Sequence, residues 1–219
     1  MAKEKQKLSI KKVALIHSDH FLFLLYLSVM ILVTFLQQEY VFLPQLTTLD
    51  IVSEESRLQI LETFQRSRWI SFLAIPVLLF MRLFLVSLCF YVGGFFFSGM
   101  GEKKFKDWWH ISLIAQSVMV VYGVTLFVFN ISVGSDITSR LTRYTSLLCL
   151  GGDNMDSWIR LPLSSINLFE VFYWVVMSLL IVRLCKTKIG KAFQFVMSTY
   201  GVGYFFYIAF LMFLQLYLS

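Results

Sequence analysis

The stretch Trp69–Ser98, WISFLAIPVLLFMRLFLVSLCFYVGGFFFS, decides the fold class of this 219-residue chain. Its only charged residue is Arg82. A membrane-spanning helix needs about 20 mostly apolar residues, so this stretch predicts a spanning helix that is long enough to tilt or to project. Pro76 predicts a kink in it, because proline removes one backbone donor and crowds the preceding turn.

Four further stretches of the same character accompany it. The chain is 58% apolar and 15% charged, whereas soluble domains average about 45–50% and about 25%. This composition excludes a disordered chain and argues against a small soluble enzyme. We therefore predict an all-α polytopic bundle in which residues 21–219 form a single transmembrane domain behind a basic tail, 1–20. The five expected spans cover 21–37, 69–98, 108–129, 166–184 and 192–218.

The basic residues predict the orientation of these spans. All eleven lysines fall in residues 1–20, 99–107 and 183–191, which lie on one side if the spans alternate. The opposite loops hold eight of the thirteen acidic residues and no lysine. Because Lys and Arg accumulate in cytoplasmic loops, we predict an N-terminus inside and a C-terminus outside. The net charge of +6 is thus read as membrane orientation, and no nucleic-acid partner is expected.

The first outer loop has helical features of its own. Ser53 has the character of an N-cap, with Glu54 and Glu55 in the first turn. Glu62 and Arg66 are spaced as an i,i+4 ion pair. These features predict an amphipathic helix over about 53–68, either on the outer face or as an extension of the second span.

Arg82 and Glu170 are the two charges well inside the expected spans, whereas Arg183 lies at the end of the fourth. A charge in hydrocarbon costs at least about 2.5–3.5 kcal/mol, so such residues usually face the bundle and pair. We predict an Arg82–Glu170 ion pair that joins the second and fourth spans. The alternative is that Arg82 snorkels to the surface while Glu170 lies near the interface.

Small and polar residues recur at helical spacing in the third and fifth spans, which predicts helix-packing faces. These residues are Ser112, Gln116 and Gly123 in the third span, and Gln194, Ser198 and Gly201 in the fifth. The pair Gly93-Gly94 predicts a close approach or a helix break. No metal site, cofactor or catalytic residue is expected.

Aromatic and histidine side chains mark the expected inner boundary of the third span. Trp108 and Trp109 have the position of an aromatic belt at the membrane interface, and His110 the position of a headgroup neighbour. His20 and Asp19 precede the first span, where interfacial side chains are common.

Several motifs between Trp69 and Leu218 resemble the Yip (Ypt/Rab-interacting) membrane-protein family, and its short bacterial-type branch most. They are Ile75-Pro76, Gly93-Gly94, Gly99-Met-Gly101, Lys104-Phe105-Lys106, Ile166-Asn-Leu-Phe-Glu170, Tyr173-Trp174 and Gly190-Lys191-Ala192. The resemblance implies a five-helix bundle with a cytosolic N-terminus and no assigned catalytic residues. Eukaryotic members carry a longer N-terminal region linked to Rab GTPase binding, whereas this chain has about twenty residues there.

These observations favour a non-enzymatic integral membrane protein, a scaffold or accessory subunit of a membrane complex, in a bacterial inner membrane. Its expected partners are the lipid bilayer and other membrane-protein subunits, and a homo-oligomer through the third and fifth spans is compatible with the sequence. The alternative is a permease-like transport component with a polar site around Arg82 and Glu170.

Overall fold

The computed structural model describes residues 2–44, 54–97, 99–100, 103–133, 143, 145–150 and 157–218. The named secondary-structure elements in this part of the chain are all helices. Five of them are long and apolar enough to cross a membrane: Asp19–Phe42, Leu58–Gly94, Phe105–Ser132, Leu168–Cys185 and Ile189–Tyr217. The predicted all-α class and the five spans are therefore confirmed.

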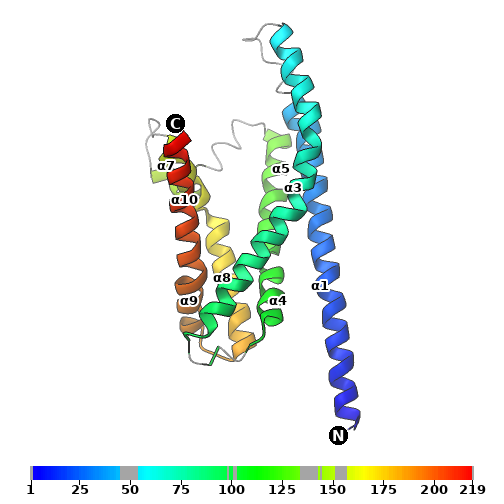
Figure 1. The fold of residues 1–219 in the computed structure, drawn as a ribbon, viewed down its shortest axis with the longest axis vertical. Coiled ribbons are helices and arrows are strands. Elements are labelled where there is room, and N and C mark those ends of the chain that lie inside the picture. Colours follow the sequence, from blue (N-terminus) through cyan, green and yellow to red (C-terminus); the bar gives the residue numbers. More distant parts are fainter. Residues whose placement is uncertain are drawn as a thin grey trace.

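The first span belongs to a helix that is longer than the span itself. α1 (Ala2–Gln37) includes nearly all of the basic tail and passes directly into a short π-helix, η1 (Gln38–Phe42). Figure 1 shows α1 along one side of the molecule, with the chain's N-terminus and C-terminus at opposite ends. An ion pair between Arg68 and Glu39 joins η1 to the next helix.

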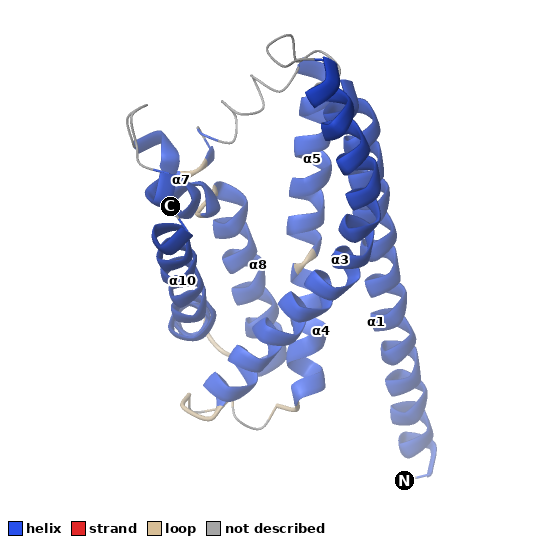
Figure 2. Ribbon diagram, turned by 45° about the horizontal axis from the view of Figure 1, so that its top comes forward, coloured by secondary structure: helices blue, strands red, loops and turns tan. Residues whose placement is uncertain are grey.

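The second span belongs to a 41-residue helix, α3 (Glu54–Gly94). The amphipathic segment is therefore an extension of this span, one of the two alternatives the sequence left open, although Ser53 lies outside the described residues. The predicted Glu62–Arg66 pair forms, at 2.7 Å. α3 runs beside α1 and then slants across the bundle (Figures 1 and 2), and Pro76 inside it supplies a physical reason for the change of direction.

Two spans are interrupted helices. The third consists of α4 (Phe105–Ala115) and α5 (Ser117–Val133), separated at Gln116. The fifth consists of α9 (Ile189–Val196), the π-helix η3 (Met197–Gly201) and α10 (Val202–Leu218). π-helical turns inside α-helices are rare and occur often at functional sites.

The fourth span, α8 (Leu168–Cys185), is a single α-helix. Before it, η2 (Leu147–Leu150) and α7 (Ser157–Ser165) lie beside each other, and an isolated bridge joins Ser146 to Asn167. α7 also packs against α10. These short elements cover the end of the bundle at which α8 begins (Figure 1).

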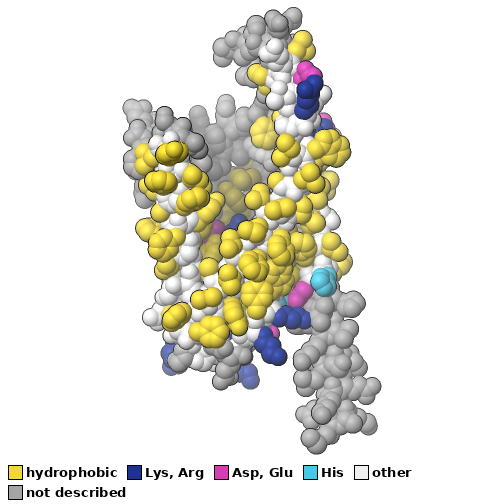
Figure 3. Space-filling model, in the orientation of Figure 1, with side chains coloured by type: hydrophobic (Ala, Val, Ile, Leu, Met, Phe, Trp, Pro, Cys, Tyr) yellow, Lys and Arg dark blue, Asp and Glu magenta, His cyan; other side chains and the backbone are white. Residues whose placement is uncertain are grey.

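The main core lies where α3, α4, α8 and α9 meet. Three fully buried aromatic rings, Phe90, Trp108 and Phe195, fill it with centroid separations of 5.4–5.8 Å. A second core cluster, which includes Tyr26, Leu83 and Leu113, holds α1 to α3 and α4. The basic residues Lys103, Lys104, Lys186 and Lys188 flank the ends of the helices at the first core, and Figure 3 shows basic side chains gathered at this end.

Candidate functional site

The candidate site is built around Glu170 in the first turn of α8. Asn167 is the N-cap of this helix, and its side-chain oxygen accepts a 2.9 Å hydrogen bond from the Glu170 backbone N–H. An Asn cap followed three residues later by Glu fits the start signal of a helix, where the helix dipole stabilises the acid. The Glu170 side chain is buried, so its carboxylate must find partners within the protein.

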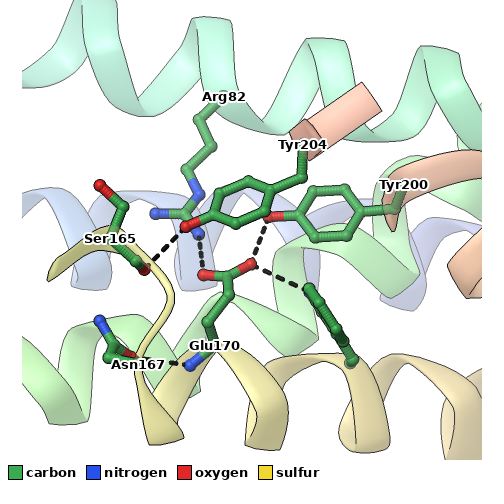
Figure 4. A network of polar contacts seen from close by, with 7 residues as sticks. Arg82, Ser165, Asn167, Glu170, Tyr200 and Tyr204 are labelled. Atoms are coloured by element: carbon green, nitrogen blue, oxygen red, sulfur yellow. Dashed lines mark hydrogen bonds and ion pairs between the residues drawn. The ribbon is translucent and has the colours of Figure 1, made fainter. Parts of the chain in front are cut away.

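Two donors bind one oxygen of this carboxylate. Glu170 Oε1 accepts a 2.6 Å hydrogen bond from the Tyr200 hydroxyl and a 3.1 Å hydrogen bond from Trp174 Nε1 (Figure 4). Trp174 lies one turn further along α8, whereas Tyr200 comes from η3 in the fifth span. The carboxylate thus links the fourth span to the fifth.

The other oxygen faces Arg82 of α3. Arg82 Nη2 lies 3.6 Å from Glu170 Oε2, so the structure brings together the two charges that the sequence analysis paired. The guanidinium carbon also lies 5.4 Å from the centroid of the Tyr173 ring, within cation–π range. The second, fourth and fifth spans therefore meet at one polar cluster, defined here as the Glu170 cluster: Arg82, Glu170, Tyr173, Trp174 and Tyr200.

The π-helix η3 explains how the fifth span keeps its tyrosines on this side. The partly or fully buried residues Val196, Tyr200, Tyr204 and Ile208 recur every four residues. In a regular α-helix a spacing of four drifts by about 40° per step. The wider turn of η3 offsets part of this drift, and the Tyr204 hydroxyl accordingly donates a 2.7 Å hydrogen bond to the Ser165 carbonyl at the end of α7.

The predicted packing face of the third span is partly inside the bundle. Ser112 and Gln116 are buried, and Ser112 Oγ and Gln116 Oε1 have no hydrogen-bond partner among the described residues. Gly123 faces elsewhere: a Cβ atom on it would lie 3.8 Å from Met30 Sδ of α1. The face therefore does not pack as one unit.

The prediction for the fifth span needs correction. Gln194 and Ser198 are exposed, and Gly201 lies within η3, where a Cβ atom would have only ordinary contacts with its own helix. The buried face of α9 instead carries Ala192, Phe195 and Val196. The physical reason is that burial of an aromatic ring and of apolar side chains removes more apolar area than burial of an amide and a hydroxyl, whose polar groups would need buried partners.

The close approach of helices occurs at Gly93. A Cβ atom on Gly93 would overlap with the Thr199 methyl group, so α3 contacts η3 through the bare glycine backbone.

The predicted interfacial position of Trp108 is wrong: its side chain is fully buried in the core and does not form part of an aromatic belt. Trp109 remains partly exposed.

A second polar contact lies where α1 meets α4. His110 Nδ1 contacts Asp19 Oδ1, and Asp19 is buried although the residue next to it, His20, is exposed. His110 therefore contacts α1, which its predicted position beside the lipid headgroups did not include. A pocket of about 310 Å³ opens beside this contact, lined by Asp19, His20, Phe23, Phe80, Lys106 and Trp109.

Sequence reasoning found the two charges of the Glu170 cluster but missed its hydroxyl and indole donors. Asn167 and Trp174 had a detectable signal, because they lie three residues before and four residues after Glu170 on one helix. Tyr200 had none, because it is thirty positions away and is placed by a π turn. Tyr173 was noted only as part of a motif.

The five long apolar helices are compatible with a multi-pass membrane protein. Comparisons with protein-family models, with curated proteins and with solved structures find no match to this chain. The function must therefore be inferred from the geometry itself.

Proposed function

We propose that the chain is a non-enzymatic integral membrane protein that acts as a scaffold or accessory subunit of a membrane complex. The observation that supports this most is the filled core at the lysine-rich end. Phe90, Trp108 and Phe195 are fully buried and in mutual contact there. Close-packed rings make a rigid element, which suits a protein that holds partners rather than one that conducts solutes.

The proposed topology has the N-terminus in the cytoplasm and the C-terminus outside, in a bacterial inner membrane. Lysines next to the ends of α3, α4, α8 and α9 share one end of the molecule, and the positive-inside rule assigns that end to the cytoplasm. We also propose membership of the Yip family, on the motifs in the sequence that resemble it.

Cysteine accessibility in intact cells tests this topology. In a background without Cys89, Cys149 and Cys185, Lys188→Cys and Arg66→Cys place single thiols on two exposed positions. An impermeant thiol reagent should label Arg66→Cys in intact cells and Lys188→Cys only after lysis. Labelling of both in intact cells contradicts the proposed topology.

A scaffold requires a partner on a defined face. Leu73 on α3 and Phe206 on α10 are comparably exposed, at 72% and 67%, and each accepts a photo-crosslinking residue without disturbing the core. A scaffold should give a saturable crosslink to one protein from one face and not from the other. Crosslinks to lipid alone, at both positions and across expression levels, would count against it.

The second candidate is a transport component with a polar site around Arg82 and Glu170. The observation that favours it is the unequal exposure of the pair: the Arg82 side chain is 37% exposed, and the Glu170 side chain 5%. Anion or proton flux into proteoliposomes that is lost in Glu170→Gln would support transport. If neither the wild type nor Glu170→Gln conducts anions or protons into proteoliposomes, the scaffold is favoured.

A further inference from the structure

The two partners of the central ion pair differ in how many of their hydrogen-bonding groups are used. Both carboxylate oxygens of Glu170 have partners: Oε1 accepts from Tyr200 and Trp174, and Oε2 faces Arg82. The carboxylate therefore has little remaining demand for donors.

The guanidinium group of Arg82 has an excess of donors. It carries five N–H groups. Among the described residues it lies 3.6 Å from Glu170 Oε2 and interacts with the hydroxyl groups of Tyr173 and Tyr200, which leaves N–H groups to spare. Charge-assisted N–H···O bonds are usually about 2.7–2.9 Å long. The Tyr173 ring covers the guanidinium from one side, with its centroid 5.4 Å from the guanidinium carbon. Figure 4 shows a terminal nitrogen that points away from the carboxylate.

One face of the molecule is hollowed (Figure 3), and the Arg82 side chain is partly exposed. Figure 3 shows this face of the molecule hollowed between α10 and α3, with a basic and an acidic side chain at its bottom. The exposed fraction of Arg82, 37%, shows that a probe the size of water reaches the guanidinium. The Tyr204–Ser165 hydrogen bond fixes α10 to the end of α7.

Unpaired N–H groups at membrane depth are costly, because hydrocarbon offers no acceptor. A planar guanidinium with a free edge matches two oxygens of a phosphate or a carboxylate group. We propose that the hollow beside Arg82 binds an anionic phosphate or carboxylate group, held by the guanidinium edge that faces away from Glu170. This inference does not rest on the proposed scaffold role.

The arrangement predicts how the affinity for the anion changes when the charge of Glu170 or of Arg82 is removed. Ligand and Glu170 are both anions and share one cation, so they oppose each other electrostatically. Removal of the Glu170 charge should therefore strengthen binding, whereas removal of the Arg82 charge should abolish it. A hollow filled with water alone makes neither prediction.

The test uses the full chain in nanodiscs, with two sources of the anion. Inorganic phosphate is titrated by calorimetry in phosphatidylcholine discs, and retained phosphatidylglycerol is counted against phosphatidylcholine by native mass spectrometry in mixed discs. The variants are wild type, Arg82→Gln, Glu170→Gln and the double variant. Arg66→Gln is the matched control, because Arg66 is paired with Glu62 on the same helix but is 80% exposed and lies sixteen residues before Arg82.

Glu170→Gln should bind at least about tenfold more tightly than wild type, which is about 1.4 kcal/mol. Arg82→Gln and the double variant should lose binding, and Arg66→Gln should equal wild type. Phosphate binding with this pattern identifies a water-soluble anion, whereas enrichment of phosphatidylglycerol alone identifies a lipid headgroup. If Arg82→Gln fails to fold, the double variant gives the same information, because it leaves no unpaired charge.

Three results would overturn the proposal. They are no binding of either probe to wild type and Glu170→Gln, binding that survives in the double variant, and equal affinity in wild type and Glu170→Gln. The first would leave water as the occupant of the hollow. The second would place the anion elsewhere, and the third would separate it from the Arg82–Glu170 pair.

Discussion

Tyr200 donates a 2.6 Å hydrogen bond to Glu170, and this bond attaches the π-helical turn of the fifth span to the first turn of the fourth. The two residues are buried, and Arg82 approaches the same carboxylate from the second span. The Glu170 carboxylate on the fourth span therefore contacts residues of the second and fifth spans. Its neighbours offer the sharpest tests of the structure.

Tyr200→Phe removes only the hydroxyl that binds Glu170. We expect the free energy of unfolding to fall by about 1–2 kcal/mol, because a hydrogen bond to a buried charge is lost while the ring stays packed. Unfolding in mixed micelles with increasing dodecyl sulfate measures this. Tyr207→Phe is the control, since Tyr207 is exposed on α10, and an equal loss in both variants would contradict the assignment.

Neutralising one member of the Arg82–Glu170 pair should cost more than neutralising both. Arg82→Gln leaves a buried carboxylate without its cation, a loss of about 3–5 kcal/mol where a buried pair is broken. The double variant Arg82→Gln/Glu170→Gln should recover part of this loss. A double-mutant cycle on the free energy of unfolding measures the coupling. Additive effects would show that the 3.6 Å approach has no energetic meaning.

Gly93→Ala should destabilise the contact between α3 and η3. The added methyl group would overlap with the Thr199 side chain, and a close-packed core yields to such a change at a cost of about 1–3 kcal/mol. Thr199→Ser, which removes the overlapping methyl group, should restore part of the stability. Gly190→Ala is the control, because a Cβ atom there meets nothing within 4 Å. The midpoint of thermal unfolding in detergent measures both variants. An equal decrease in Gly190→Ala and Gly93→Ala would contradict the contact.

Asp19 and His110 should hold α1 against α4 as a pair. Asp19→Asn and His110→Asn are each expected to loosen α1, and the double variant should be no worse than either alone, because both remove the same contact. The readout is crosslinking between Met30→Cys and Gly123→Cys, whose positions are in contact across α1 and α5. His20→Asn is the neighbouring control and should leave the crosslinking yield unchanged.

Local patterns along the chain were enough to predict the spans. Apolar runs the length of a bilayer give helices in any tertiary context, because the backbone must satisfy its own hydrogen bonds in lipid. Pro76 and the Glu62–Arg66 pair were readable for the same reason, since both act within one helix. The lysines also carry their information locally, although the compartment they face is still a prediction.

Which faces of the helices meet was decided by the tertiary structure. Trp108 lies in the core and Gln194 at the surface, although their local sequence suggested the reverse. The choice depends on how rings from several helices fill a shared space, which hydropathy along one helix does not encode. The sequence by itself determined the class, the five spans and the pairing of Arg82 with Glu170. Only the tertiary structure decided that Tyr200 and Trp174 complete the Glu170 cluster and that Arg82 keeps an open edge, because these relations arise from helix crossings and a π turn between distant parts of the chain.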